Sequence, residues 1–381
     1  MSFLTSLLTL SKANPSLKYG LLLFSYMSLV RHLRYRRINN LLRKYPDPTL
    51  PLRDLNVARE VTTATSGYDF PFVNVISLEF ALFKTYAIPS ISKILAATKQ
   101  FATQCPKRAD DTGLILCEMT ETYKRQEYRR MTEGKENLDE DLTDAKRERL
   151  ALEKLNLIHG HYPIRQEDYL YTLALFILEP VSWINRLEWR QVTDLEKNAL
   201  LAVWTFHGQN MKIENIPKTF DELAQWSENY ERENMVYAPS NVAIAQATTS
   251  LLLSKSPKVM HPLGRHIVSS LLTDRLRTAF AIPNPPRGLT TFILGVFKVR
   301  RFFIQYLLLP KRYPNFRTAL RANDEGKFVP RWNKYAPVYP NGYHIEDLGP
   351  NKFLGKCPVS LKNIQLPTTT ANNNDNKFIA V

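Results

Sequence analysis

The chain has 381 residues, of which 44% are hydrophobic, enough to bury the core of one large domain or two ordinary ones. Lys and Arg number 51 against 36 Asp and Glu, a formal net charge of +15 that favours nucleic acid or an anionic membrane as a neighbour. The sequence holds no zinc finger, RNP-type aromatic pair or GXXG loop, which excludes the usual nucleic-acid modules and favours the membrane. Three scattered cysteines also exclude a disulfide framework.

Residues 1–38 are predicted to form a membrane anchor with a basic flank. Two apolar stretches, 3–10 and 19–30, precede the segment RHLRYRR. The second stretch is shorter than the roughly 20 residues of a bilayer span, so the anchor either spans with Lys18 snorkelling or lies in the interface. A cleaved signal peptide is the alternative, but no small-residue cleavage site precedes the basic run. The positive-inside rule would place everything after Arg31 in the cytosol.

Two long stretches follow a short proline-rich linker. Residues 70–101 are apolar and aromatic, and we expect two helices broken near Pro89, with Ser90 capping the second. Residues 123–149 are dense in charge, which predicts a solvated helix-loop-helix or a mobile surface insertion and not a site.

Between residues 70–101 and 123–149 we expect a helix that starts at Pro106. It begins with a polar trio. Arg108, Asp111 and Thr112 lie at i, i+3 and i+4, on the face that carries apolar residues further along. A functional cluster is one interpretation. The other is a salt bridge between Arg108 and Asp111 at the helix terminus.

The most informative stretch runs from residue 153 to residue 190. Leu152, Leu155 and His159 lie at i, i+3 and i+7, so His159 continues an apolar stripe on a helix. His161 would point roughly 200° further round a 3.6-residue helix, beyond a stop at Gly160. This helical context argues against both histidines binding one metal ion.

The helix expected next is apolar all round, from residue 169 to 178, which is typical of a buried helix. Asp168 can cap it, and Pro180 is expected to interrupt it. An inward histidine beside such a helix is most often a core residue with a polar partner. It can also be the single proximal ligand of a haem iron.

The rest of the chain continues the helical pattern. Thr193 and Asp194 can cap a helix that contains His207, and Pro217, Thr219 and Glu222 mark the start of the next. Residues 240–280 predict two amphipathic helices, and residues 290–309 a basic amphipathic segment that suits either a membrane surface or packing against the domain. Because strand signals are sparse, we predict an all-α fold. It would comprise the anchor (1–38), one helical domain (39–345) and a disordered tail (346–381).

Four blocks of the sequence occur in an order typical of one family. They are LVRHLRYRR; EFALFKTYAIPSISKIL; R-x-x-D-T with the following LILCEMTE; and LNLIHGHY…EDYLYTLALFILEPVSWINRLEWR. In these blocks the chain resembles the family of the fungal endoplasmic-reticulum-bound oxygenase of mycophenolic acid biosynthesis. The bacterial latex clearing proteins, which are rubber oxygenases, are more distant relatives.

This resemblance implies a single globin-like helical domain that binds haem b through one histidine, here His159, and activates O₂ on the other side. It also implies roles for the trio. Arg108 would hold a haem propionate or bound oxygen, Asp111 would orient Arg108, and Thr112 would donate or accept a hydrogen bond in the distal pocket. The reaction implied is the cleavage of a carbon–carbon double bond in a prenyl, other isoprenoid or lipid substrate by O₂. The implied location is the endoplasmic reticulum membrane, with the catalytic domain cytosolic and no nucleic acid as partner.

One departure and two alternatives accompany this resemblance. The spacing from Thr112 to His159 is longer than expected for the family, because of the charged residues 123–149. A non-catalytic, membrane-associated lipid- or prenyl-binding protein on the same scaffold is the first alternative. A metal-dependent hydrolase using His159, His161 and His207 is the second.

Overall fold

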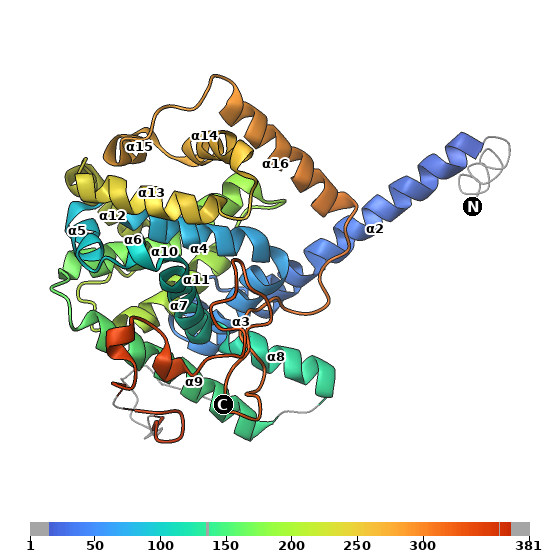
Figure 1. Cartoon of the computed structure of the whole chain (residues 1–381). Helices are drawn as coiled ribbons and strands as arrows, with labels where there is room; N and C mark the ends of the chain where they lie inside the picture. Colours follow the sequence, from blue (N-terminus) through green and yellow to red (C-terminus); the bar gives the residue numbers. More distant parts are fainter. Residues whose placement is uncertain (1–14, 135–136, 358, 367–381) are drawn as a thin grey trace.

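The computed structural model describes residues 15–134, 137–357 and 359–366, and within them the fold is all-α, as predicted. Its one β-type pairing in that part of the chain is an isolated bridge between Phe328 and Tyr343. The α-helices (Figure 1) are α2 (Pro15–Lys44), α3 (Leu55–Thr63), α4 (Pro71–Thr85), α5 (Pro89–Ala97), α6 (Gln100–Thr103), α7 (Cys105–Thr120), α8 (Thr122–Glu133), α9 (Leu138–His159), α10 (Gln166–Leu187), α11 (Asp194–Asn210), α12 (Phe220–Asn234), α13 (Pro239–Leu253), α14 (His261–Leu271), α15 (Asp274–Phe280) and α16 (Leu289–Tyr306).

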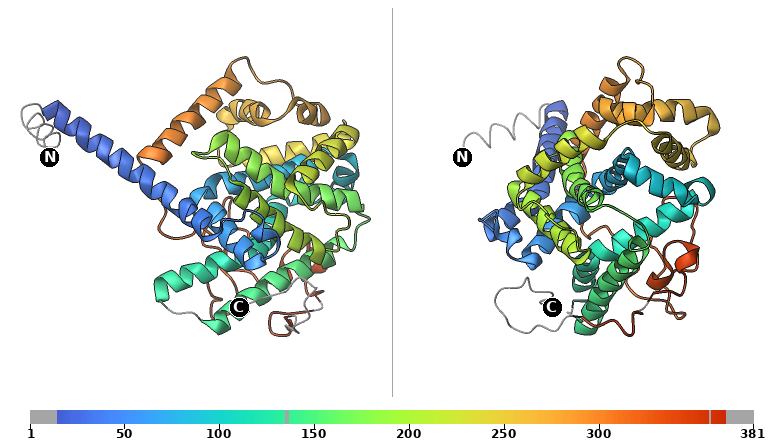
Figure 2. Two further views of the ribbon diagram at one scale, coloured as in Figure 1. Left: turned by 180° about the vertical axis from the view of Figure 1, so that it is seen from behind. Right: turned by 90° about the vertical axis from the view of Figure 1, so that its left-hand side faces the viewer.

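The core is built around α10, which packs along α4 and against α11 (Figures 1 and 2). As predicted from its apolar sequence, α10 is buried on most of its surface; Tyr171, Ala174 and Ile177 are fully buried. A second cluster joins α7, α9 and the C-terminal segment. Burial of the apolar side chains around α10 and in this second cluster supplies much of the favourable free energy of folding.

The predicted breaks of α9 and α10 are half right. The first helix ends at His159 with Gly160 as its C-cap, as expected. The prediction that Pro180 interrupts the next helix is wrong, because α10 continues through it to Leu187. Pro180 is itself buried in the middle of the core, so packing on both sides offsets the cost of a lost backbone hydrogen bond.

Two predicted caps are also wrong, because the side chains are used elsewhere. The N-cap of α10 is Arg165 and that of α5 is Ile88. Ser90 Oγ instead donates to Asp168 Oδ1 at 2.8 Å, which joins the first turns of α5 and α10. The caps of α11 and α12 are confirmed: Thr193 and Thr219 each form a capping box.

Residues 240–280 form three α-helices where two were predicted. Thr273 separates α14 from α15 and caps the latter, since its side chain accepts from the backbone of Leu276. A single Ser/Thr cap inside an amphipathic stretch was enough to start a new helix there.

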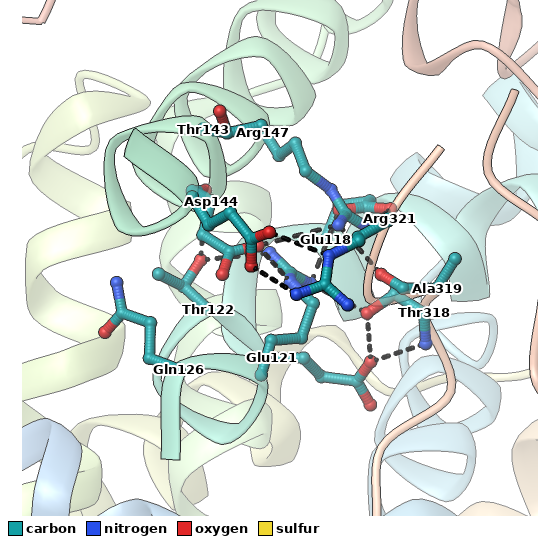
Figure 3. Close-up of polar contacts among 12 residues, drawn as sticks. Glu118, Glu121, Thr122, Gln126, Thr143, Asp144, Arg147, Thr318, Ala319 and Arg321 are labelled. Carbon is teal, nitrogen blue, oxygen red and sulfur yellow. Dashed lines mark hydrogen bonds and ion pairs between the residues drawn. The ribbon is translucent and has the colours of Figure 1, made fainter. Parts of the chain in front are cut away.

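In its described residues the charged stretch 123–149 forms two helices, as predicted. Arg130, Glu133 and Asp139 are exposed, but the expectation that the charges are solvated is wrong for those on the inner side. Arg125 and Arg147 are fully buried, and Asp144 is 1% exposed. Arg147 binds Glu118 of α7 through two nitrogens at 2.8 and 2.9 Å (Figure 3). Arg125 Nε binds Asp144 at 2.5 Å. The charges are buried because opposite charges from α7, α8 and α9 satisfy one another.

Residues 317–319 of the C-terminal segment complete the hydrogen bonds of this network. Glu121 accepts hydrogen bonds from the backbone of Arg317 and Thr318, and Arg147 donates to the carbonyl of Ala319 at 2.8 Å (Figure 3). The prediction of a disordered tail from residue 346 is wrong for Leu348, Phe353 and Ile364, which are buried in the cluster of α7 and α9. The remainder of the predicted tail, residues 367–381, lies outside the described residues.

The predicted anchor corresponds to α2, with residues 1–14 outside the part of the chain that the structure describes. The second half of α2 packs on the domain through Val30, Arg34, Ile38 and Leu41, whereas its first half extends away from it (Figures 1 and 2). Among the described helices, no single one has both the length and the apolar composition to cross a bilayer. Helices α4 and α5 together have that length and composition, but they are bent by 91° where they meet.

Candidate active site

A cavity of about 190 Å³ lies inside the helical pack, between α5, α7, α9, α10 and α11. Most of its lining is apolar; examples are Ile91 and Leu95 of α5, Leu116 of α7 and Phe176 of α10. Ionisable residues are few and come from different helices: Arg108, Asp111, His159, Asp168 and His207, together with three tyrosines. An apolar chamber with a few convergent polar groups is the usual form of a binding site for an apolar ligand or cofactor.

His159 lines this cavity from the last turn of α9, where the apolar stripe predicts it. Its Nδ1 atom is buried and has no hydrogen-bond partner among the described residues. Burial, together with the nearby Arg108 guanidinium, lowers the pKa of His159 to about 4. The ring is therefore neutral at physiological pH, which is the form that can bind a metal. It is not the satisfied core histidine of the alternative interpretation.

Arg108 and Thr112 line the same cavity from one face of α7 and are hydrogen-bonded to each other, Nη1 to Oγ1. Thr112 Oγ1 also donates to the backbone carbonyl of Arg108 at 2.8 Å. The pairing fixes the guanidinium against the cavity wall. The described part of residues 123–149 forms α8 and the first half of α9, and none of these residues lines the cavity.

Asp111 is placed differently from the prediction. It accepts from Lys107 Nζ at 2.8 Å and from the hydroxyl of Tyr339, and no hydrogen bond or ion pair joins it to Arg108 in the described structure. The same facts contradict the alternative of an Arg108–Asp111 salt bridge. Asp111 ties the start of α7 to the C-terminal segment, and Thr112 is the group that holds Arg108.

His161 is exposed beyond the end of α9, as expected from the break at Gly160. Its ring packs on Phe353 and its Nδ1 lies 2.8 Å from the carbonyl of Leu157. Within the described residues, no group of three or more His, Cys, Asp or Glu side chains could hold a metal ion. The hydrolase hypothesis, which needs His159, His161 and His207 together, fails on this geometry.

His207 is the functional candidate that the sequence analysis undervalued. It is 2% exposed, lines the cavity from α11, and its Nδ1 has no hydrogen-bond partner among the described residues. Burial, with a smaller contribution from Arg59, lowers its pKa to about 3. The signal was present in the sequence, because Leu200, Trp204 and His207 form a stripe at i, i+4 and i+7 like that of His159.

Comparison with known proteins identifies the family of the chain. Residues 81–302, which include every ionisable residue of the cavity named above, match the family described as "ER-bound oxygenase mpaB/B'/Rubber oxygenase, catalytic domain". The chain belongs to this family. Membership in the MpaB/rubber oxygenase family makes the protein an oxygenase, and hence an enzyme.

Three relatives cover most of the chain. The ER-bound oxygenase mpaB' of Penicillium brevicompactum is 30% identical over 389 residues, covering 88% of each protein. The ER-bound oxygenase mpaB of Penicillium roqueforti (strain FM164) is 33% identical over 279 residues, 68% of this chain and 87% of that protein. The ER-bound oxygenase mpaB of Penicillium brevicompactum is 30% identical over 286 residues, which cover 70% of this chain and 68% of that protein. The predicted resemblance is confirmed.

Proposed function

We propose that this MpaB-family oxygenase holds haem b through His159 and cleaves a carbon–carbon double bond of a prenyl, isoprenoid or lipid substrate with O₂. The observation that carries the proposal is the His159 imidazole, neutral and with a buried, unpartnered nitrogen, in the wall of an apolar cavity. The expected globin-like arrangement, a haem enclosed between helices, is part of the proposal.

The residues present fit a haem in three ways. A buried imidazole nitrogen without a partner is costly unless something binds it, and haem iron accepts a single proximal histidine. The apolar lining suits the porphyrin faces, and Arg108 places a fixed cation where a propionate could be bound. When bound, the haem would supply the O₂ chemistry, while the protein supplies ligation, orientation and a dry chamber.

The polar residues of α7 and α9 at this site then have distinct tasks. His159 keeps its neutral form at physiological pH because protonation is disfavoured in the buried site. Thr112 holds Arg108 in place and presents a hydroxyl to the cavity. Asp111 and Lys107 fix the start of α7, the helix that carries Arg108 and Thr112.

The apolar walls favour an apolar substrate, which would be dissolved in a membrane. The relatives are named ER-bound, and the basic, apolar N-terminal segment fits that location. We therefore propose the endoplasmic reticulum membrane as the location, with the catalytic domain on the cytosolic side. The substrate and O₂ are the proposed small-molecule partners.

The second candidate function, lipid or prenyl binding without catalysis, rests on the same apolar lining. It differs in its consequence for the purified protein, which would contain lipid and no iron. A neutral lipid gives no partner to the buried nitrogen of His159, which is why we prefer the haem.

The test is a comparison of three variants by their Soret absorbance per protein. His159→Ala should abolish haem retention, because it removes the only proposed bond to iron. His161→Ala is the matched control, one residue beyond Gly160 and exposed, and should retain haem. His207→Ala should also retain it. Loss of haem in His207→Ala but not in His159→Ala would show that the ligand comes from α11.

A further inference from the structure

The positive charge of the protein is concentrated in two segments. Residues 1–46 and 281–323 contain sixteen Lys and Arg and no Asp or Glu, leaving 35 basic residues against all 36 acidic ones in the rest of the chain. In the fold these segments meet: α16 packs against α2. Five exposed basic side chains lie in these two segments, namely Arg31, Arg36, Lys298, Lys311 and Arg312.

Helix α16 is apolar on two neighbouring faces, about 100° apart around the helix axis. On its inner face Ile293 is buried, Phe297 packs against the core cluster that contains Trp189, and Arg300 pairs with Glu188 at 2.9 Å. The outer face is an exposed stripe at i, i+4, i+7 and i+11: Phe292 (68% exposed), Val296 (53%), Val299 (58%) and Phe303 (48%). A soluble helix places polar residues on such a face, and a contiguous exposed apolar patch marks an interaction surface.

The first half of α2 continues this apolar surface away from the domain. Leu22, Leu23, Phe24 and Leu29 are each more than half exposed. The two helices are tied where they meet, because Tyr26 donates to the carbonyl of Leu307 at 2.9 Å and buried Arg34 donates to that of Leu308 at 2.8 Å. In Figure 1 the exposed half of α2 runs outward from this contact, across the direction of α16.

We propose that the outer stripe of α16 and the exposed half of α2 form one docking surface for a bilayer containing anionic phospholipids. Helix α16 would lie in the headgroup region with its stripe in the acyl boundary, while α2 enters beside it. The exposed basic residues of the two segments would bind the lipid phosphates. Because α2 and α16 are hydrogen-bonded to each other and both contact the membrane, they fix the orientation of the domain on it. A single flexible anchor would not fix that orientation.

The concentration of charge decides between a membrane and a second copy of the chain. Two copies meeting through this surface would bring two strongly basic segments together, which like charges oppose. An anionic bilayer offers the complementary charge and a large apolar phase at once. The inference is independent of haem, since it uses residues outside the cavity.

A first experiment measures flotation of the full-length protein with phosphatidylcholine vesicles, with and without phosphatidylserine. Phosphatidylserine should raise the partition coefficient about tenfold or more, and high salt should reduce that gain because it screens the charges. Equal binding to both kinds of vesicle, or no binding, overturns the proposal.

A second experiment locates α16 itself, because α2 alone could float the protein. Val299→Trp places a reporter on the outer stripe, and Val236→Trp, 51% exposed and outside both segments, is the matched control. Vesicles with brominated acyl chains should quench the added fluorescence of the first variant and not the second. Flotation without quenching of Val299→Trp overturns the role of α16.

A third measurement tests for a second copy as the occupant. The double variant Val296→Asn with Val299→Asn should show the same mass by light scattering as wild type, and a lower vesicle partition coefficient. If it changes a dimer into a monomer and binds vesicles like wild type, the stripe is a subunit interface and the membrane proposal is wrong.

Discussion

Glu118→Gln should destabilise the protein by about 3–5 kcal/mol, the usual cost of breaking a buried ion pair from one side. Glu118 is fully buried and accepts from Arg147 at 2.8 and 2.9 Å and from the Tyr343 hydroxyl at 2.6 Å. Arg125 lies 3.5 Å away. The amide keeps the volume but removes the charge, so two buried guanidinium groups lose their common counter-ion.

Urea unfolding at pH 7, followed by tryptophan fluorescence, measures the change. The matched control is Glu133→Gln, which breaks an exposed pair with Arg321 and should cost less than about 1 kcal/mol. Equal effects of the two substitutions would refute the claim that the network around Glu118 holds α7, α8 and α9 together.

The pH dependence of this effect has a definite sign. Burial raises the pKa of Glu118, but Arg147 and Arg125 outweigh it and hold the pKa below its usual value. A carboxyl whose pKa is lowered by folding stabilises the protein above its unfolded pKa and loses that contribution as the pH falls through the folded pKa. The difference between wild type and Glu118→Gln should therefore narrow at acidic pH, below about pH 4.

Two further predictions concern the cavity. Arg108→Ala and Thr112→Val should retain haem through His159 and lower oxygen uptake with a polyprenyl substrate by roughly tenfold to a hundredfold, since groups beside a cofactor tune it without ligating it. Loss of the Soret band in either variant would show that the His159 bond alone does not retain the haem. Because folding lowers the pKa of His207, the unfolded chain binds an extra proton below about pH 6.5, and stability should fall as the pH drops from there. In His207→Gln that fall should be smaller by up to about 1.4 kcal/mol per pH unit, measured by urea unfolding of haem-free protein; an unchanged slope would contradict the burial of a neutral imidazole.

Local periodicity predicted much of the fold and the position of His159 in the cavity wall. The stripe that ends in His159 placed this ring in the cavity and His161 outside it, because a straight helix sets side-chain direction from spacing alone. The capping boxes at Thr193 and Thr219 were predicted for the same reason: their hydrogen bonds are local in sequence.

What sequence could not predict depends on contacts between distant segments. Arg125 and Arg147 looked like solvated charges because their partners include Glu118 on another helix and carbonyl and hydroxyl groups near residue 318. The Arg108–Asp111 salt bridge that helical spacing allowed does not form, because Asp111 pairs with Lys107, four residues earlier, and with Tyr339, 228 residues away. Burial of a charge is decided by tertiary partners, which composition does not show.

We propose that this MpaB-family oxygenase is a haem protein, and its haem content after purification tests that claim. Full-length protein expressed with a haem supply should be purified and its haem quantified per chain from the absorption spectrum, with iron measured in parallel. We expect a Soret band with about one haem and one iron per chain, as a single axial histidine implies. Colourless, iron-free protein that is folded and contains bound lipid would contradict the claim.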